Sequence, residues 1–247
     1  MTPESIECKN CKRLFEGNYC NNCGQKADQK RFTFKKLLGE FIYGFVHVHG
    51  GFLFTVKELF NRPGEVLRGY IEGRRVNYYR PFSFLLLISL AGSFLYTRSG
   101  IIEYVNENFL NAGEILNFTS KHFSYRLLMT IPTYALTCWV LYRSYHYNLA
   151  EHLIINTYLI SQSFVIMVAW LLISSLLKPE NGIFTILYIC AFLSVIIYQV
   201  IVFFHLFNIG NKALRWLKAS AAVLIGFGFS FILINGLVRL GNLLFSV

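Results

Sequence analysis

Charged side chains are scarce in this chain, and acidic ones are the scarcest. Asp, Glu, Lys and Arg make up 15% of the residues, whereas a typical soluble domain carries about 25%. Hydrophobic residues reach 55% and aromatic residues 17%. This balance excludes an ordinary soluble globular protein and favours a protein whose outer surface meets lipid and headgroups.

Other absences narrow the class further. The first 36 residues contain no apolar run, so no secretory signal peptide is visible and a secreted disulfide framework is disfavoured. The chain has no P-loop, G-x-S-x-G or dinucleotide-binding fingerprint in a usable context, and its histidines do not match the H-x-x-E-H protease spacing. These absences favour reduced cysteines and leave no recognisable catalytic motif.

Four cysteines near the N-terminus form the most specific pattern. Cys8, Cys11, Cys20 and Cys23 make two C-x2-C pairs separated by eight residues. Each pair suits a knuckle whose two sulfurs converge on one tetrahedral metal, so the spacing predicts a closed, structural zinc ribbon. Gly24 favours the left-handed turn after the second pair, whereas Lys12 suits the equivalent place less well. A redox role for the pairs is the alternative.

Apolar stretches dominate the rest of the chain. A hydrocarbon core of about 30 Å needs about 20 helical residues. The sequence therefore predicts an all-α integral membrane protein with about five transmembrane helices. We place these helices at 81–97, 127–144, 152–177, 183–207 and 217–238. With the zinc ribbon at 1–30 and a basic amphipathic segment at 31–80, the transmembrane bundle occupies 81–247.

The segment 31–80 is expected to lie on the membrane surface, because its apolar residues recur at helical spacing within a basic, aromatic stretch. A sixth, poor transmembrane pass at 41–56 is the alternative. In the five-span arrangement, 18 of the 23 Lys and Arg residues fall on the side of the N-terminus. The positive-inside rule then predicts a cytoplasmic N-terminus and a periplasmic C-terminus.

Polar residues at the cytoplasmic ends of the predicted helices form a candidate site. Ionisable groups are costly in lipid and should face the bundle interior. Interhelical hydrogen bonds, a headgroup or small-solute pocket, and a second metal site are the three interpretations. The candidate residues at these helix ends are Arg143, His146, Glu151, His152, His205 and Asn208, and Asn156 lies on the polar face of the third predicted helix.

The arginines before the first predicted span allow two interpretations. Arg74, Arg75 and Arg80 alternate with tyrosines, which suits plain anchoring at the headgroup level. Because guanidinium groups match phosphate oxygens, they also suit a specific site for an anionic lipid headgroup or pyrophosphate.

Several motifs together resemble the bacterial domain-of-unknown-function 3667 family. The resemblance rests on Cys20-Asn21-Asn22-Cys23-Gly24, Gly51-Phe52, Thr55, Leu59, Arg62-Pro63-Gly64, Arg68, Tyr70-Ile71, Gly73-Arg74-Arg75, Tyr79, Pro81 and Glu151-His152-Leu153. It implies a zinc-ribbon membrane protein of unassigned activity and supplies no catalytic residues.

The leading hypothesis is a non-enzymatic protein of the bacterial inner membrane, with the ribbon as a cytoplasmic docking or regulatory module for a protein partner. The lipid bilayer, including anionic lipid, is the other expected partner. The alternative is a lipid-handling enzyme or transporter with a cavity lined by the polar and arginine residues. Nucleic-acid binding is disfavoured, because the ribbon offers few aromatic side chains for stacking.

Overall fold

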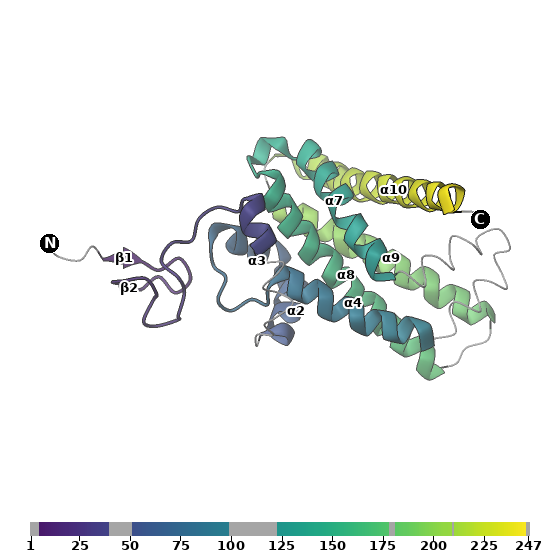
Figure 1. The fold of residues 1–247 in the computed structure, drawn as a ribbon, viewed down its shortest axis with the longest axis horizontal. Coiled ribbons are helices and arrows are strands. Elements are labelled where there is room, and N and C mark those ends of the chain that lie inside the picture. The colour runs from purple at the N-terminus through teal and green to yellow at the C-terminus, as the bar shows by residue number, and fades with distance from the viewer. Residues whose placement is uncertain (1–4, 40–50, 99–122, 178–180, 209, 246–247) are drawn as a thin grey trace.

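The computed structural model describes residues 5–39, 51–98, 123–177, 181–208 and 210–245. Its elements, in chain order, are β1 (Ile6–Glu7), β2 (Leu14–Phe15), α2 (Phe52–Asn61), α3 (Pro63–Glu72), α4 (Pro81–Arg98), α7 (Phe123–Leu141), η1 (Arg143–Tyr145), α8 (Leu149–Leu177), α9 (Asn181–Leu206) and α10 (Lys212–Phe245). A short helical stretch also covers 34–39. The ribbon lies at one end of the molecule, and the long helices extend away from it (Figure 1).

The five apolar helices expected from the sequence are present close to their expected positions. Among the described residues, three stretches are long and apolar enough to cross a bilayer: Leu149–Leu177, Thr185–Leu206 and Lys212–Gly236. Two shorter apolar stretches, Pro81–Leu95 and Met129–Leu141, accompany them. The fold is therefore that of a membrane protein with three helices of spanning length, and the count of about five spans stays a prediction.

Helices α2 and α3 form a hairpin against one side of the bundle, between the ribbon and the long helices (Figure 1). Pro63 occupies the first turn of α3, where its missing N–H removes no helical hydrogen bond. Gly73 ends α3 in the left-handed conformation, with φ of 115°. Of the predicted 41–56 pass, residues 41–50 lie outside the described part, and α2 begins at Phe52.

Side chains from the bundle fix α2 in place. Gln162 of α8 donates a hydrogen bond to the carbonyl of Val56 at 3.1 Å, and the Tyr198 hydroxyl of α9 donates to that of Leu59 at 3.1 Å. Its opposite face leaves Leu53 and Phe54 exposed. An exposed apolar face on a helix held beside the bundle fits the expected position at the membrane surface.

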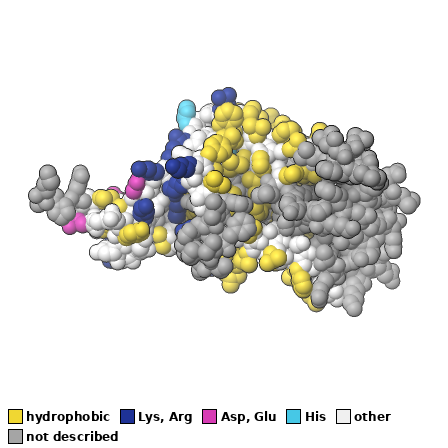
Figure 2. All heavy atoms as spheres, in the orientation of Figure 1, with side chains coloured by type: hydrophobic (Ala, Val, Ile, Leu, Met, Phe, Trp, Pro, Cys, Tyr) yellow, Lys and Arg dark blue, Asp and Glu magenta, His cyan; other side chains and the backbone are white. Residues whose placement is uncertain are grey.

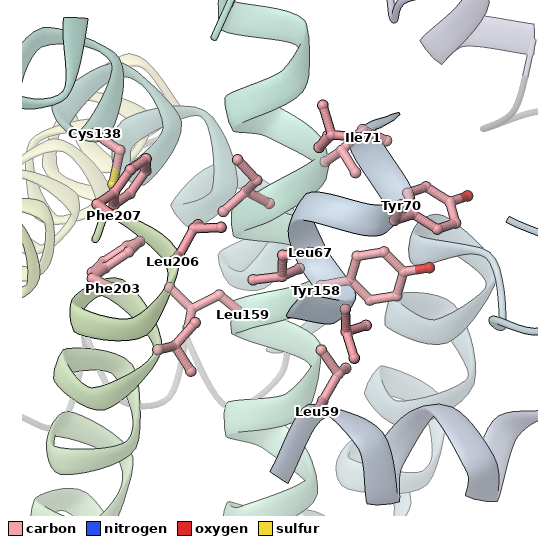
Figure 3. Packing of buried hydrophobic residues seen from close by; sticks show 14 of the residues in the cluster. Leu59, Leu67, Tyr70, Ile71, Cys138, Tyr158, Leu159, Phe203, Leu206 and Phe207 are labelled. Carbon is pink, nitrogen blue, oxygen red and sulfur yellow. The ribbon is translucent and has the colours of Figure 1, made fainter. Parts of the chain in front are cut away.

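The main core lies where the hairpin meets α8 and α9 (Figure 3). The buried residues there include Leu59, Leu67, Tyr70, Ile71, Cys138, Tyr158, Leu159, Phe203, Leu206 and Phe207. Tyr70 of α3 packs edge-on against Tyr158 of α8, with ring centroids 5.1 Å apart. The hairpin is therefore an integral part of the folded body.

Positive charge gathers at the ribbon end of the helices. On the face shown in Figure 2, Lys and Arg side chains cluster where the ribbon meets the bundle, and hydrophobic side chains cover the helices beyond. Helices α4, α8 and α10 begin at this end, and α7 and α9 end there. This arrangement agrees with the uneven distribution of positive charge read from the sequence.

Candidate metal centre and its contacts with the helical body

The four N-terminal cysteines converge on one point. Their sulfur atoms all lie within 4.8 Å of one another, with Cys8 Sγ 3.5 Å from Cys23 Sγ and Cys11 Sγ 3.6 Å from Cys20 Sγ. Four sulfurs bound tetrahedrally to zinc at about 2.3 Å are about 3.8 Å apart. The donor set and its spacing therefore fit a four-thiolate metal ion, with no ligand position left open for a substrate.

The two cysteine pairs adopt the same local fold. In the first, the Lys12 N–H donates to the Cys8 carbonyl at 2.9 Å, and in the second the Gly24 N–H donates to the Cys20 carbonyl at 2.8 Å. Both turn residues are left-handed, with φ of 63° at Lys12 and 73° at Gly24. Lys12 thus takes the conformation for which glycine is better suited, at an energetic cost of about 1–2 kcal/mol.

The surroundings of the cysteines in the ribbon shift the pKa values of two of their thiols. Hydrogen bonds from the Arg13 backbone N–H and from the Asn22 side chain lower the pKa of the Cys11 thiol to about 6. Burial raises the pKa of the Cys23 thiol to about 11. Since the thiolate is the form that binds metal, Cys11 is ready to bind at neutral pH, whereas metal binding must displace the Cys23 proton.

Gln25, two residues after the last cysteine, joins the ribbon to the helical body. Its buried side chain donates to the Gly73 carbonyl at 2.5 Å and accepts from the Arg75 backbone N–H at 3.3 Å. A Cβ atom at Gly73 would lie 3.0 Å from the Lys9 side chain. The φ of 115° at Gly73 favours glycine at this turn, and a side chain there would also displace Lys9 by a few tenths of an ångström.

Arg31 pairs with the candidate residue Glu151. The guanidinium donates from Nε to Glu151 Oε1 at 2.6 Å and from Nη2 to Oε2 at 2.7 Å, and it also donates to the carbonyl of His146. The Glu151 side chain is 1% exposed. The carboxylate is thus held by a paired, two-point contact and also accepts from the Asn148 backbone N–H at 2.9 Å.

Phe32 fills a pocket on the same surface and is fully buried. Its ring stacks on Tyr70 at a centroid distance of 5.9 Å, and the Arg75 guanidinium lies 3.8 Å from the Phe32 ring centroid. Arg75 also donates to Gln29 Oε1 at 3.0 Å and to the Tyr70 carbonyl at 3.0 Å. Arg75, one of the candidate phosphate-binding arginines, therefore holds the segment that follows the cysteines, residues 25–32, which we call the linker.

The other candidate arginines lie apart from one another. Arg74 reaches Glu72, with 3.7 Å between Nη2 and Oε2, and Arg143 lies over the half-buried Trp139, 4.6 Å from the ring centroid. Arg80 precedes the first residue of α4 and makes further contacts of its own. These side chains do not converge on one point in the described contacts.

The candidate histidines and Asn156 also occupy separate environments. His146 and His205 are exposed, and each uses its backbone carbonyl to accept a hydrogen bond from an arginine. His152 is fully buried between Tyr147 and Phe207, and neither ring nitrogen has a hydrogen-bond partner among the described residues. Asn156 is buried and donates to the His152 carbonyl at 2.8 Å. Arg31 links Glu151 to His146, whereas Asn156 contacts only the backbone of His152 among the candidate residues that the structure describes.

An apolar groove of about 640 Å³ lies between α8 and α9 beneath the hairpin. Its lining residues are Phe60, Pro63, Val165, Ile166, Ala169, Trp170, Ile173, Ser194, Ile197, Tyr198 and Ile201. None of the candidate polar residues lines it. The groove and the polar residues at the ribbon end are therefore separate features.

Comparison with known proteins supplies one match. Residues 49–91 match the model of a family described as "Protein of unknown function (DUF3667)". This match confirms the resemblance seen in the sequence. The chain matches no curated protein and no solved structure. The DUF3667 segment comprises α2, α3 and the first part of α4.

Residues of the DUF3667 segment have structural roles that the geometry explains. A Cβ atom at Gly64 would lie 2.6 Å from the His205 carbonyl oxygen, so α3 can cross the end of α9 only with glycine there. Arg68 donates to the last carbonyls of α9, at 3.1 Å to His205 and 2.9 Å to Leu206. Thr55 Oγ1 accepts from the Tyr79 backbone N–H at 2.8 Å.

Gln25, Arg31 and Phe32 belong to none of the motifs recognised in the sequence. Gln25 and Arg31 contact residues 48 and 120 positions away along the chain. One weak indication of a buried anchor is visible in the sequence: Phe32 is a large apolar residue that directly follows a mostly polar stretch, residues 24–31. Their partners Arg75 and Glu151 were identified, although as candidates for ligand binding.

Proposed function

We propose that this chain is a zinc-containing protein of the bacterial inner membrane whose ribbon is a cytoplasmic docking or regulatory module. The four convergent sulfurs carry the proposal, because their number and separation suit structural Zn²⁺ and leave no open position for catalysis. Zinc in such a ribbon supplies folding free energy. The body then serves as the membrane-embedded support of the ribbon, and an unidentified cytoplasmic protein is the expected partner.

The contacts at the ribbon end favour this function over lipid handling. Glu151 would be the natural proton carrier of a headgroup enzyme, yet its carboxylate is buried and paired with Arg31. Arg75 is occupied by Phe32 and Gln29. A headgroup would have to displace contacts that hold the fold together.

Metal analysis of the purified full chain tests the zinc site. We expect one zinc per chain, and loss of the metal in the double variant Cys8→Ser/Cys20→Ser. Cys190→Ser is the matched control, because Cys190 lies on the exposed surface of α9 away from the ribbon. Purified protein without zinc, or a double variant that keeps its zinc, would refute the proposed site.

Protease access tests the proposed orientation. A cleavage sequence inserted at the exposed turn of Glu16 and Gly17 should resist protease added to the periplasmic side and be cut in inverted membrane vesicles. Cleavage from the periplasmic side would contradict a cytoplasmic ribbon.

A further inference from the structure

Gln25 takes part both in the second cysteine knuckle and in the contact between the ribbon and the helical body. Its backbone carbonyl accepts the Cys20 N–H at 2.8 Å, so its main chain is part of the second cysteine knuckle. Its side chain bonds the Gly73–Arg75 turn of the body through one donor and one acceptor contact. The position of the docking side chain is therefore set by the same turn that places Cys20 and Cys23.

The ribbon has little besides a metal to hold it folded. Its sheet consists of two strands of two residues, paired as Ile6 with Phe15 and Glu7 with Leu14. Its buried apolar cluster contains Cys8, Phe15 and Cys20, two of which are metal ligands. A module of this size requires metal to fold. Without metal, the knuckle that positions Gln25 has no independent support.

Contacts after Gln25 continue the docking along the chain. Lys9 of the first knuckle donates to the Gln29 carbonyl at 3.1 Å, and Gln29 Oε1 accepts from Arg75. Arg31 then reaches Glu151, and the Phe32 carbonyl accepts from the Asn148 side chain at 3.1 Å. Ribbon and linker thus share contacts with α3, with the turn after it and with the start of α8.

We propose that metal binding by the four cysteines and docking of residues 25–32 on the helical body are energetically coupled. This inference rests on the metal site proposed above. With metal bound, the ribbon is fixed on the body through Gln25, Arg31 and Phe32. Loss of the metal releases this segment and uncovers the Glu151 carboxylate, the Gly73 carbonyl and the pocket of Phe32. The body thereby senses the metal content of the ribbon.

Hydrogen exchange of the full chain in detergent tests the coupling directly. The Arg75 amide donates to Gln25 Oε1, so its exchange rate reports docking on the body side. After zinc removal by a chelator, exchange in peptides covering 25–32 and 73–76 should accelerate by about 5-fold or more, the lower end of usual coupling between sites. Exchange in peptides of the buried part of α8 after residue 156 should not change when the zinc is removed.

Coupling must be reciprocal, which supplies a second test. Arg31→Gln should weaken zinc binding by about 5-fold or more in competition with a chromogenic chelator, although Arg31 contacts none of the cysteines. Lys30→Gln is the matched control, because it removes a neighbouring positive charge whose exposed side chain pairs with the exposed Asp28 and, among the described residues, makes no contact with the helical body. The control should bind zinc like the unmodified chain.

The outcomes separate this inference from the metal site beneath it. If the chain binds no zinc, the proposed metal site and the coupling both fail. If zinc binds but its removal leaves exchange at 25–32 and 73–76 unchanged, the coupling alone is refuted. Equal zinc affinity in Arg31→Gln and Lys30→Gln would refute it as well.

Discussion

The two halves of α8 differ sharply in their surroundings. Every residue from Ala150 to Ser163 except Leu153 is buried, whereas from Phe164 to Leu177 only Leu171 is. Helix α9 shows the same division in reverse, because its buried residues concentrate towards its end at Leu206. The ribbon-proximal half of the body is thus enclosed by protein, and the distal half presents its side chains outward.

The enclosed half also holds most of the polar side chains of α8. Along α8 these are Glu151, His152, Asn156, Thr157, Ser161, Gln162 and Ser163, all of them buried. Most have hydrogen-bond partners, such as the Ser163 hydroxyl, which accepts from Gln199 of α9 at 3.0 Å. Buried polar groups are costly unless they are paired. The ribbon-proximal half is therefore packed like the core of a soluble domain, with buried and paired polar groups. The distal half instead exposes apolar side chains, which suit contact with lipid.

The largest difference in stability is expected between alanine substitutions of two leucines in α8, one in each half. Leu159→Ala removes a side chain that is 1% exposed and leaves a cavity, so we expect a loss of about 2–5 kcal/mol in the free energy of unfolding. Leu176→Ala alters a side chain that is 82% exposed, and we expect a change within about 0.5 kcal/mol. Unfolding in mixed detergent measures both. Equal losses would erase the distinction between the halves.

Substitution of two glycines should give smaller changes in stability, and the two changes should have opposite signs. At Gly64 a methyl group would meet the backbone of His205 and Leu206, so Gly64→Ala should destabilise the protein by about 1–3 kcal/mol through overpacking. At Gly228 in α10 nothing lies within 4 Å of the added atom, and Gly228→Ala should stabilise the helix by about 0.5–1 kcal/mol. Thermal unfolding of both variants checks the signs. A stabilising Gly64→Ala would mean that α3 does not cross α9 so closely.

The smallest effect concerns single hydroxyl groups. The Tyr158 hydroxyl is buried and donates to the Tyr79 carbonyl at 2.5 Å, so Tyr158→Phe should cost about 0.5–1.5 kcal/mol. Tyr188 of α9 lies in the distal half with 45% of its side chain exposed. Tyr188→Phe should leave the unfolding free energy nearly unchanged, and a larger loss at Tyr188 than at Tyr158 would contradict the comparison.

The positions of the long helices could be predicted from the sequence, because each one coincides with a long apolar run that is visible without knowledge of its neighbours. Helix α4 begins at Pro81 as expected, because proline suits the first turn of a helix, whereas α10 begins at Lys212, ahead of the expected start at 217. The hairpin was predicted only as a surface segment. Its contacts with α8 and α9 depend on Gly64 and Arg68, whose roles appear only when His205 is brought beside them.

The candidate site was predicted unevenly for a similar reason. Four cysteines within 16 residues constrain one another through the local chain, so their convergence follows from spacing. Glu151 and Arg75 were recognised as chemically unusual, but a sequence cannot state whether a charge meets a ligand or another part of its own chain. Both meet the linker.

By itself, the sequence determined the cysteine ligand set, the apolar helices and the uneven placement of positive charge, because short-range spacing and composition control all three. Tertiary structure alone decided that the ribbon is bound to the body. Arg31 and Glu151 are 120 residues apart, and only the packing of α3 against α8 and α9 builds the surface on which they and Gln25 meet their partners.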